Sequence, residues 1–98
     1  MNGIGLTVSE VELIRAVIAR YGQVTSAVVF GSRAKGTHRS NSDVDIALDG
    51  NISPLEAESI CGDLEELPLP YHFDVVVLRH ITNEALREHI ERVGIEIC

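Results

Sequence analysis

The chain has 98 residues, of which 45% are hydrophobic and 23% charged, a composition typical of a soluble globular domain. We therefore expect a single domain, residues 1–98, with one hydrophobic core and no second lobe. The formal net charge of −7 argues against a non-specific nucleic-acid binder, which needs a basic face. A nucleotide site remains compatible with this charge, because bound metal ions reverse the local sign.

The first predicted element is a helix that ends at Gly22. Two overlapping capping boxes, one starting at Thr7 and one at Ser9, precede an apolar stripe with the 3.6-residue period of a helix. The stripe consists of Val11, Ile14, Val17, Ile18 and Tyr21.

Two strands are expected next. The β-rich run Val24–Phe30 lies between glycines, and its unbroken apolar end predicts burial on both faces. The second strand follows from strict alternation, which is typical of a strand with one apolar and one polar face. Its apolar positions are Val44, Ile46 and Leu48, and the intervening positions are Asp43, Asp45, Ala47 and Asp49.

The second half of the chain predicts two more helices around a third strand. Ser53-Pro54 with Glu56 is a strong helix start, and the prolines at 68 and 70 end that helix. Residues 71–78 form the expected third strand, and Thr82 is the expected cap of a last helix that ends at Gly94.

Residues 95–98 form either a short edge strand or a docked tail, and the pattern does not decide between them. The sequence therefore predicts an α/β (α+β) fold, in which a small mixed β-sheet packs against helices. It contains no basic-then-apolar leader and no apolar run of the ~18 residues that a membrane span needs. We expect a cytoplasmic protein without a membrane contact.

Three aspartates occupy positions within the predicted second and third strands. Asp43 and Asp45 are two residues apart, so their side chains share one face of the second strand. Like charges on one face repel, and hard oxygen ligands on one face suit Mg²⁺. Asp74 interrupts the third strand on the face opposite Phe73. If these strands are neighbours, the three carboxylates converge on one point.

A glycine-containing turn follows the first strand. Gly31 allows a ligand to approach the backbone closely, and Ser32 adds a hydroxyl donor. Arg33 and Lys35 add positive charge just beyond it. A Gly-Ser pair alone is weak evidence, since most such pairs are ordinary strand-to-helix turns.

The complete string "GSRAKGTHRSNSDVD", with its later strand aspartate, resembles the minimal nucleotidyltransferases (MNT proteins) of the DNA polymerase β-like superfamily. The resemblance extends over nearly the whole chain. It implies that Gly31 and Ser32 hold a nucleoside triphosphate and that Asp43 and Asp45 bind the metal ions. It further implies that Asp74 is the third carboxylate, close to the acceptor hydroxyl and its candidate base.

Other residues near this motif have two possible roles. Arg33 contacts phosphate or packs on the loop, whereas Lys35 is expected to be solvated. Ser42 matches the family pattern, but a hydrogen bond at strand entry explains it equally well. His72 shares the predicted face of Asp74, although imidazole suits Mg²⁺ poorly. The other histidines lack a partner at ligand spacing and are expected to be solvated or capping: His38, His80 and His89.

The resemblance implies an Mg²⁺-dependent nucleotidyltransferase that uses two ions and moves AMP from ATP onto a hydroxyl acceptor. It also implies a separately encoded helical partner. This partner is either a HEPN-type toxin, which makes the chain an antitoxin, or a four-helix substrate-binding subunit. Two alternatives remain: a non-catalytic module that binds a nucleotide or a partner, and a small-molecule nucleotidyltransferase of the antibiotic-modifying type.

Overall fold

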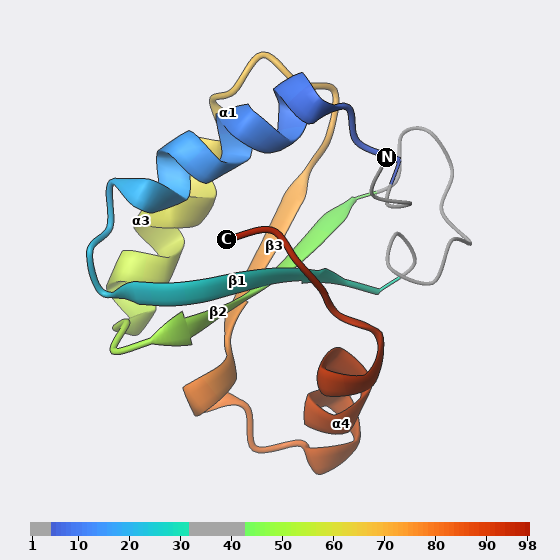
Figure 1. Ribbon diagram of the computed structural model, residues 1–98. Helices are drawn as coiled ribbons and strands as arrows, with labels where there is room; N and C mark the ends of the chain where they lie inside the picture. Colours follow the sequence, from blue (N-terminus) through green and yellow to red (C-terminus); the bar gives the residue numbers. More distant parts are fainter. Residues whose placement is uncertain (1–4, 32–42) are drawn as a thin grey trace.

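The computed structural model describes residues 5–31 and 43–98 (Figure 1). Its strands form one mixed sheet in the order β3-β2-β1-β4, in which β1 is antiparallel to both neighbours and β2 is parallel to β3. This arrangement confirms the predicted fold class. In chain order the elements are α1 (Val8–Ala19), β1 (Val24–Phe30), β2 (Val44–Gly50), α3 (Pro54–Glu65), β3 (Phe73–Val77), the 3₁₀ turn η1 (Leu78–His80), α4 (Glu84–Val93) and β4 (Ile95–Glu96).

Helices cover both faces of the sheet. Helices α1 and α3 pack on one face, and α4 packs on the other (Figure 1). Buried residues of α1 and α3 meet the alternate residues of β1, β2 and β3 that point toward them. The largest fully buried side chains of this core are Leu6, Ile14, Ile18, Ile46, Leu48, Ile60 and Leu64.

A smaller apolar cluster lies under α4 and shows why β1 is apolar on both faces. Phe30, Ala47 and Ile90 are its buried members. Ala27 and Val29 of β1 face the opposite way, into the main core. The predicted burial of both faces at the end of β1 is therefore confirmed.

Side-chain caps set the starts of the helices. The Thr7 hydroxyl accepts from the Glu10 N–H at 3.1 Å, which selects the earlier of the two predicted capping boxes. The Ser53 capping box is also present. The prediction of Thr82 as the last cap is wrong. The cap is Asn83, whose Oδ1 accepts from the Leu86 N–H at 3.1 Å and lies at the spacing that reaches this donor.

The third strand is shorter than the predicted residues 71–78. The Tyr71 hydroxyl donates to Glu10 at 3.0 Å, so this residue is tied to α1 before the strand begins. Leu78 leaves the strand at the other end because it starts η1, where its carbonyl accepts from the Ile81 N–H at 3.2 Å. The 3₁₀ turn therefore ends the strand at Leu78, whereas at the other end the His72 carbonyl still accepts from the Val44 N–H of β2 at 2.9 Å.

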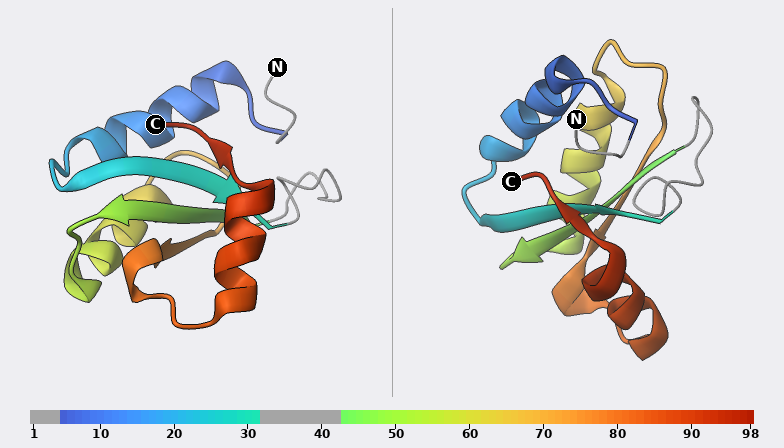
Figure 2. Two further views of the ribbon diagram at one scale, coloured as in Figure 1. Left: turned by 60° about the horizontal axis from the view of Figure 1, so that its bottom comes forward. Right: turned by 45° about the vertical axis from the view of Figure 1, so that its right-hand side comes forward.

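The chain end contains a strand followed by a docked residue. Strand β4 pairs with Val28 and Val29 of β1 (Figure 2), and Ile97 then donates its N–H to the Ala27 carbonyl at 2.9 Å. Ile97 itself is buried. None of the helices in the described part of the chain has both the length and the apolar character that a membrane crossing requires.

Candidate active site

Two of the predicted carboxylates lie side by side. In the parallel pairing of β2 with β3, Asp45 is the register partner of Asp74. Alternation places both side chains on the α4 face, because their neighbours Val44 and Phe73 point into the core under α1 and α3. Asp43 is exposed one residue before β2 begins. The condition for convergence, that β2 and β3 are neighbours, is confirmed.

Asp45 is in an unfavourable environment for a negative charge. Partial burial raises its pKa above the usual 3.8, and the nearby charges of Asp74 and then Asp43 raise it further. The negative charges of Asp43 and Asp74 therefore both act on the Asp45 carboxylate. The site is therefore a place where added positive charge is favourable.

Gly31 connects the end of β1 to the same carboxylate. Its φ of +75° lies in the left-handed region, which favours glycine. A Cβ at this position would clash with the Asp45 Oδ2 atom and lie 3.2 Å from its Cγ. The glycine therefore serves two purposes: it allows the turn, and it lets the backbone approach Asp45 closely.

Five of the candidate residues lie outside the described part of the chain: Ser32, Arg33, Lys35, His38 and Ser42. His72 is described, and its Nδ1 lies 3.5 Å from the Glu65 carboxylate.

The structure reveals one aromatic contact that the sequence pattern missed. The ring of His89 from α4 meets the Phe30 ring edge to face, at a centroid distance of 6.5 Å and an interplanar angle of 81°. Phe30 is the strand partner of Asp45 and precedes Gly31. In the sequence, the sign of this contact is an aromatic residue, Phe30, next to the Gly-Ser pair. That sign does not show that His89 is its partner.

A groove of about 310 Å³ adjoins Asp74. Asp74 lies in its wall, together with residues of α3, β3 and η1. Its lining is Pro54, Ala57, Glu58, Cys61, Asp74, Val75, Val77 and His80.

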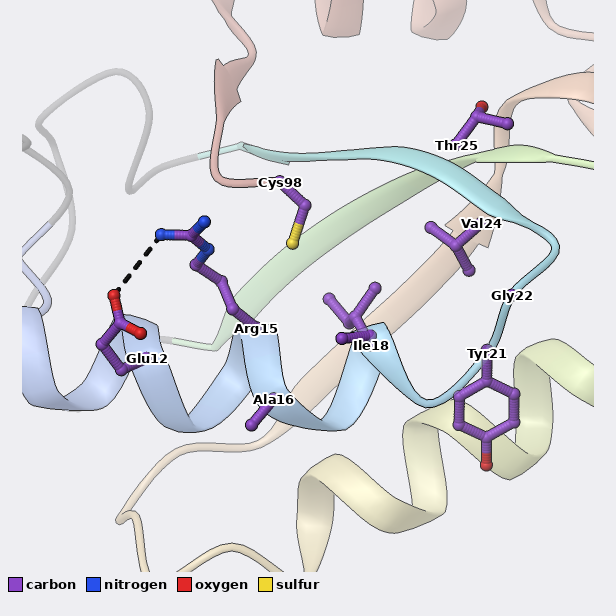
Figure 3. A pocket seen from close by; sticks show the side chains of 10 residues that line it. Glu12, Arg15, Ala16, Ile18, Tyr21, Gly22, Val24, Thr25 and Cys98 are labelled. Carbon is purple, nitrogen blue, oxygen red and sulfur yellow. Dashed lines mark hydrogen bonds and ion pairs between the residues drawn. The ribbon is translucent and has the colours of Figure 1, made fainter.

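A larger groove, of about 470 Å³, lies between α1 and the start of β1 (Figure 3). Arg15 and Cys98 face each other across it, whereas Tyr21 turns its ring toward α3 and its hydroxyl lies 2.9 Å from the Ser59 Oγ. The whole length of β1 separates this groove from Gly31. Of the two grooves, only the smaller one is therefore lined by a residue of the carboxylate pair, Asp74.

The chain's family follows from its sequence match. Residues 12–98 match the family described as "Polymerase beta, Nucleotidyltransferase". The chain belongs to this nucleotidyltransferase family. This match confirms the predicted membership of the polymerase β-like nucleotidyltransferases and the predicted enzyme class. No curated protein shows a significant match to the chain.

Solved structures share the nucleotidyltransferase fold at low sequence identity. A toxin-antitoxin structure with AMP-PNP is 22% identical, with a TM-score of 0.75, and the match covers 93% of this chain and 73% of that one. An MntA-HepT variant in which two aspartates, two positions apart, are replaced by glutamate is 21% identical, with a TM-score of 0.72 and coverage of 91% and 71%. A tri-AMPylated HEPN toxin of Shewanella oneidensis in complex with MNT antitoxin gives 18% identity, a TM-score of 0.69 and coverage of 93% and 70%. These likenesses support the fold.

Proposed function

We propose that this nucleotidyltransferase moves AMP from ATP onto a hydroxyl acceptor, in a reaction that depends on Mg²⁺. The observation that carries the proposal is the register pairing of Asp45 with Asp74, directly beside the Gly31 turn. A structural protein has no use for two adjacent carboxylates on one face of a sheet, where like charges repel.

The carboxylate oxygens of Asp43, Asp45 and Asp74 are the kind of ligand that Mg²⁺ prefers. Within residues 5–31 and 43–98, no group of three acidic, histidine or cysteine side chains is assembled closely enough to hold a metal ion. Mg²⁺ does not require such a cage, because it commonly binds through one or two carboxylates together with substrate phosphates and water. Asp45 and Asp74 are the proposed main ligands, with Asp43 as the third. When bound, the ion neutralises charge that develops on the phosphates.

The protein's own residues would position the two reactants. Gly31 and Ser32 would bind the triphosphate through backbone N–H groups and the hydroxyl, with Arg33 as a further phosphate contact. The acceptor oxygen forms a bond to the α-phosphorus, the bond from that phosphorus to the β-phosphate oxygen breaks, and pyrophosphate leaves. Asp74, on the outer strand, would accept the proton of the acceptor hydroxyl.

The proposed partner is a separately encoded small helical protein, with residues 1–98 acting as the single catalytic domain. Support comes from one of the similar solved structures, a tri-AMPylated HEPN toxin in complex with MNT antitoxin. By this analogy the partner is itself the acceptor, and the chain acts as an antitoxin. If the partner is instead a four-helix substrate-binding subunit, it holds the acceptor molecule.

A transfer assay tests this function. The protein is incubated with labelled ATP, Mg²⁺ and a small helical protein encoded beside it, and the intact masses of both proteins are measured. A gain of one AMP on the partner supports the antitoxin role, and an unmodified partner with a labelled small molecule supports the subunit role.

Asp49 provides the matched control, because it lies on the same face of β2 but its Oδ1 is 3.4 Å from the Arg79 Nε. Asp45→Asn is expected to abolish transfer, and Asp49→Asn is expected to retain it. Equal activity of wild type and Asp45→Asn would remove the proposal.

A further inference from the structure

Strand β3 is at the edge of the sheet (Figure 2, left). Its hydrogen bonds show which backbone groups face outward. The Phe73 N–H donates to the Glu65 Oε2 at 2.8 Å, and the Cys61 Sγ donates to the Phe73 carbonyl at 3.4 Å. Both partners belong to α3 rather than to β2. Because backbone direction alternates along a strand, Val75 and Val77 also turn their N–H and C=O groups outward.

Only the first part of this edge is covered. The Val75 N–H is within hydrogen-bonding reach of the Cys61 thiol. Beyond that point, no described side chain or backbone group bonds to the outward Val75 carbonyl or to the Val77 N–H, and no described strand lies outside β3. Among the described residues, a short stretch of edge is therefore left unpaired, at Val75, which is half-buried, and Val77, which is 4% exposed.

The groove beside this edge connects the two faces of the sheet. Ala57, Glu58 and Cys61 line it from α3, on the core side. Asp74 also lines it, although its side chain lies on the opposite face. The groove therefore lies along the outer edge of β3 and reaches Asp74.

The charge around the groove favours a basic occupant. Glu58 and Asp74 are in its lining, and the charge of Glu65 lies close enough to raise the pKa of the Cys61 thiol, after the larger effect of burial. His80 is the one basic side chain of the lining. An acidic segment would be repelled here, whereas lysine or arginine side chains would be attracted.

We propose that the acceptor is a polypeptide segment with basic residues, which adds to the edge of β3 as an extra strand. This inference rests on the proposed function, since it identifies the acceptor of the same site. An added strand lies about 4.8 Å from its neighbour, and its side chains alternate between the two faces. One set enters the groove beside α3, and the other reaches the carboxylate face. A serine, threonine or tyrosine of the second set places its hydroxyl beside Asp74.

The order of groups across the sheet suits a transfer reaction. The acceptor hydroxyl lies outermost, Asp74 of β3 follows, Asp45 of β2 is next, and Gly31 at the end of β1 completes the row. Of the two paired carboxylates, Asp74 is therefore the one nearer to the acceptor. A base for the acceptor hydroxyl has to be within hydrogen-bond reach of its proton.

The probe is a synthetic peptide with the sequence Lys-Lys-Val-Tyr-Val-Lys-Lys, and its counterpart with glutamates in place of the lysines is the charge control. Each is titrated into ¹⁵N-labelled protein without nucleotide, and backbone amide shifts are followed by NMR. The basic peptide is expected to shift the amides of Ala57, Glu58, Val75 and Val77 most and to slow hydrogen exchange at Val77. The acidic peptide is expected not to bind.

Charge reversal on α3 provides the variant. Glu58 is exposed, so Glu58→Arg is expected to keep the fold and weaken peptide binding by about twofold to fivefold, the size of an exposed charge effect. Glu91→Arg makes the same change at an exposed position of α4 and is expected to leave binding unchanged.

Failure of this inference is distinguishable from failure of the proposed function. If the basic peptide does not bind, or shifts amides on another surface such as the groove of Figure 3, the edge proposal is overturned. That outcome leaves ATP binding and AMP transfer to be judged by their own assays. If the peptide binds the β3 edge while ATP does not bind, docking stands and the proposed function fails.

Discussion

Replacement of Gly31 by alanine tests the close approach between the turn and Asp45. The left-handed φ of +75° costs a non-glycine residue about 1 kcal/mol. The added Cβ also clashes with the Asp45 carboxylate and forces this side chain from its position, at a further cost of about 1 kcal/mol. The free energy of unfolding should therefore fall by about 2 kcal/mol, which corresponds to a Tm roughly 10 °C lower for a domain of this size.

Urea unfolding followed by circular dichroism measures the free energy of unfolding, and a second background separates the backbone cost from the cost of the clash. In an Asp45→Ala background the clash is absent, so the cost of Gly31→Ala should drop to about 1 kcal/mol. Gly22→Ala is the control, because nothing lies within 4 Å of its added Cβ and its φ is not positive. This control should be unchanged or more stable, by less than about 1 kcal/mol. A Gly31→Ala cost no greater than that of Gly22→Ala, or one that Asp45→Ala leaves unchanged, would refute the reasoning.

Three further predictions concern charge, capping and ligand linkage. The raised pKa of Asp45 favours folding below pH 3.8, and this advantage is lost as the pH rises through the folded pKa. Without ligand, Asp45→Asn should therefore melt higher than wild type at neutral pH, and the difference should vanish in acid. Asn83→Ala should lower the stability of the protein by about 1 kcal/mol, whereas Thr82→Ala should change it little. ATP with Mg²⁺ at ~100 times its dissociation constant should stabilise the fold by ~2.7 kcal/mol, and an equal shift in excess chelator would contradict a metal bridge.

Local signals in the sequence were sufficient for most elements. The bounds of β1 matched because glycines flank a β-rich run, and the Ser53 start matched because a cap, a proline and a glutamate coincide. The choice between Thr82 and Asn83 failed, since both side chains can cap a helix. Only the position of the Asn83 Oδ1 relative to the Leu86 N–H distinguishes them.

The site depends on pairing between distant segments, which the sequence indicates only conditionally. The alternation of each strand fixed the faces of Asp45 and Asp74, but a shift by one residue would have separated them. Their common register comes from the parallel packing of β2 against β3. The edge groove was not predictable for the same reason, because it requires α3 and β3 to be packed together.

The most direct test of the central claim locates the metal ion. Mn²⁺ is added with a non-hydrolysable ATP analogue to ¹⁵N-labelled protein, and paramagnetic broadening of the amide signals is mapped onto the fold. The account predicts that broadening centres on Asp45 and Asp74 and is lost in Asp45→Asn but not in Asp49→Asn. Broadening centred elsewhere, or unchanged in Asp45→Asn, would contradict the assignment of this carboxylate pair as the metal-nucleotide site.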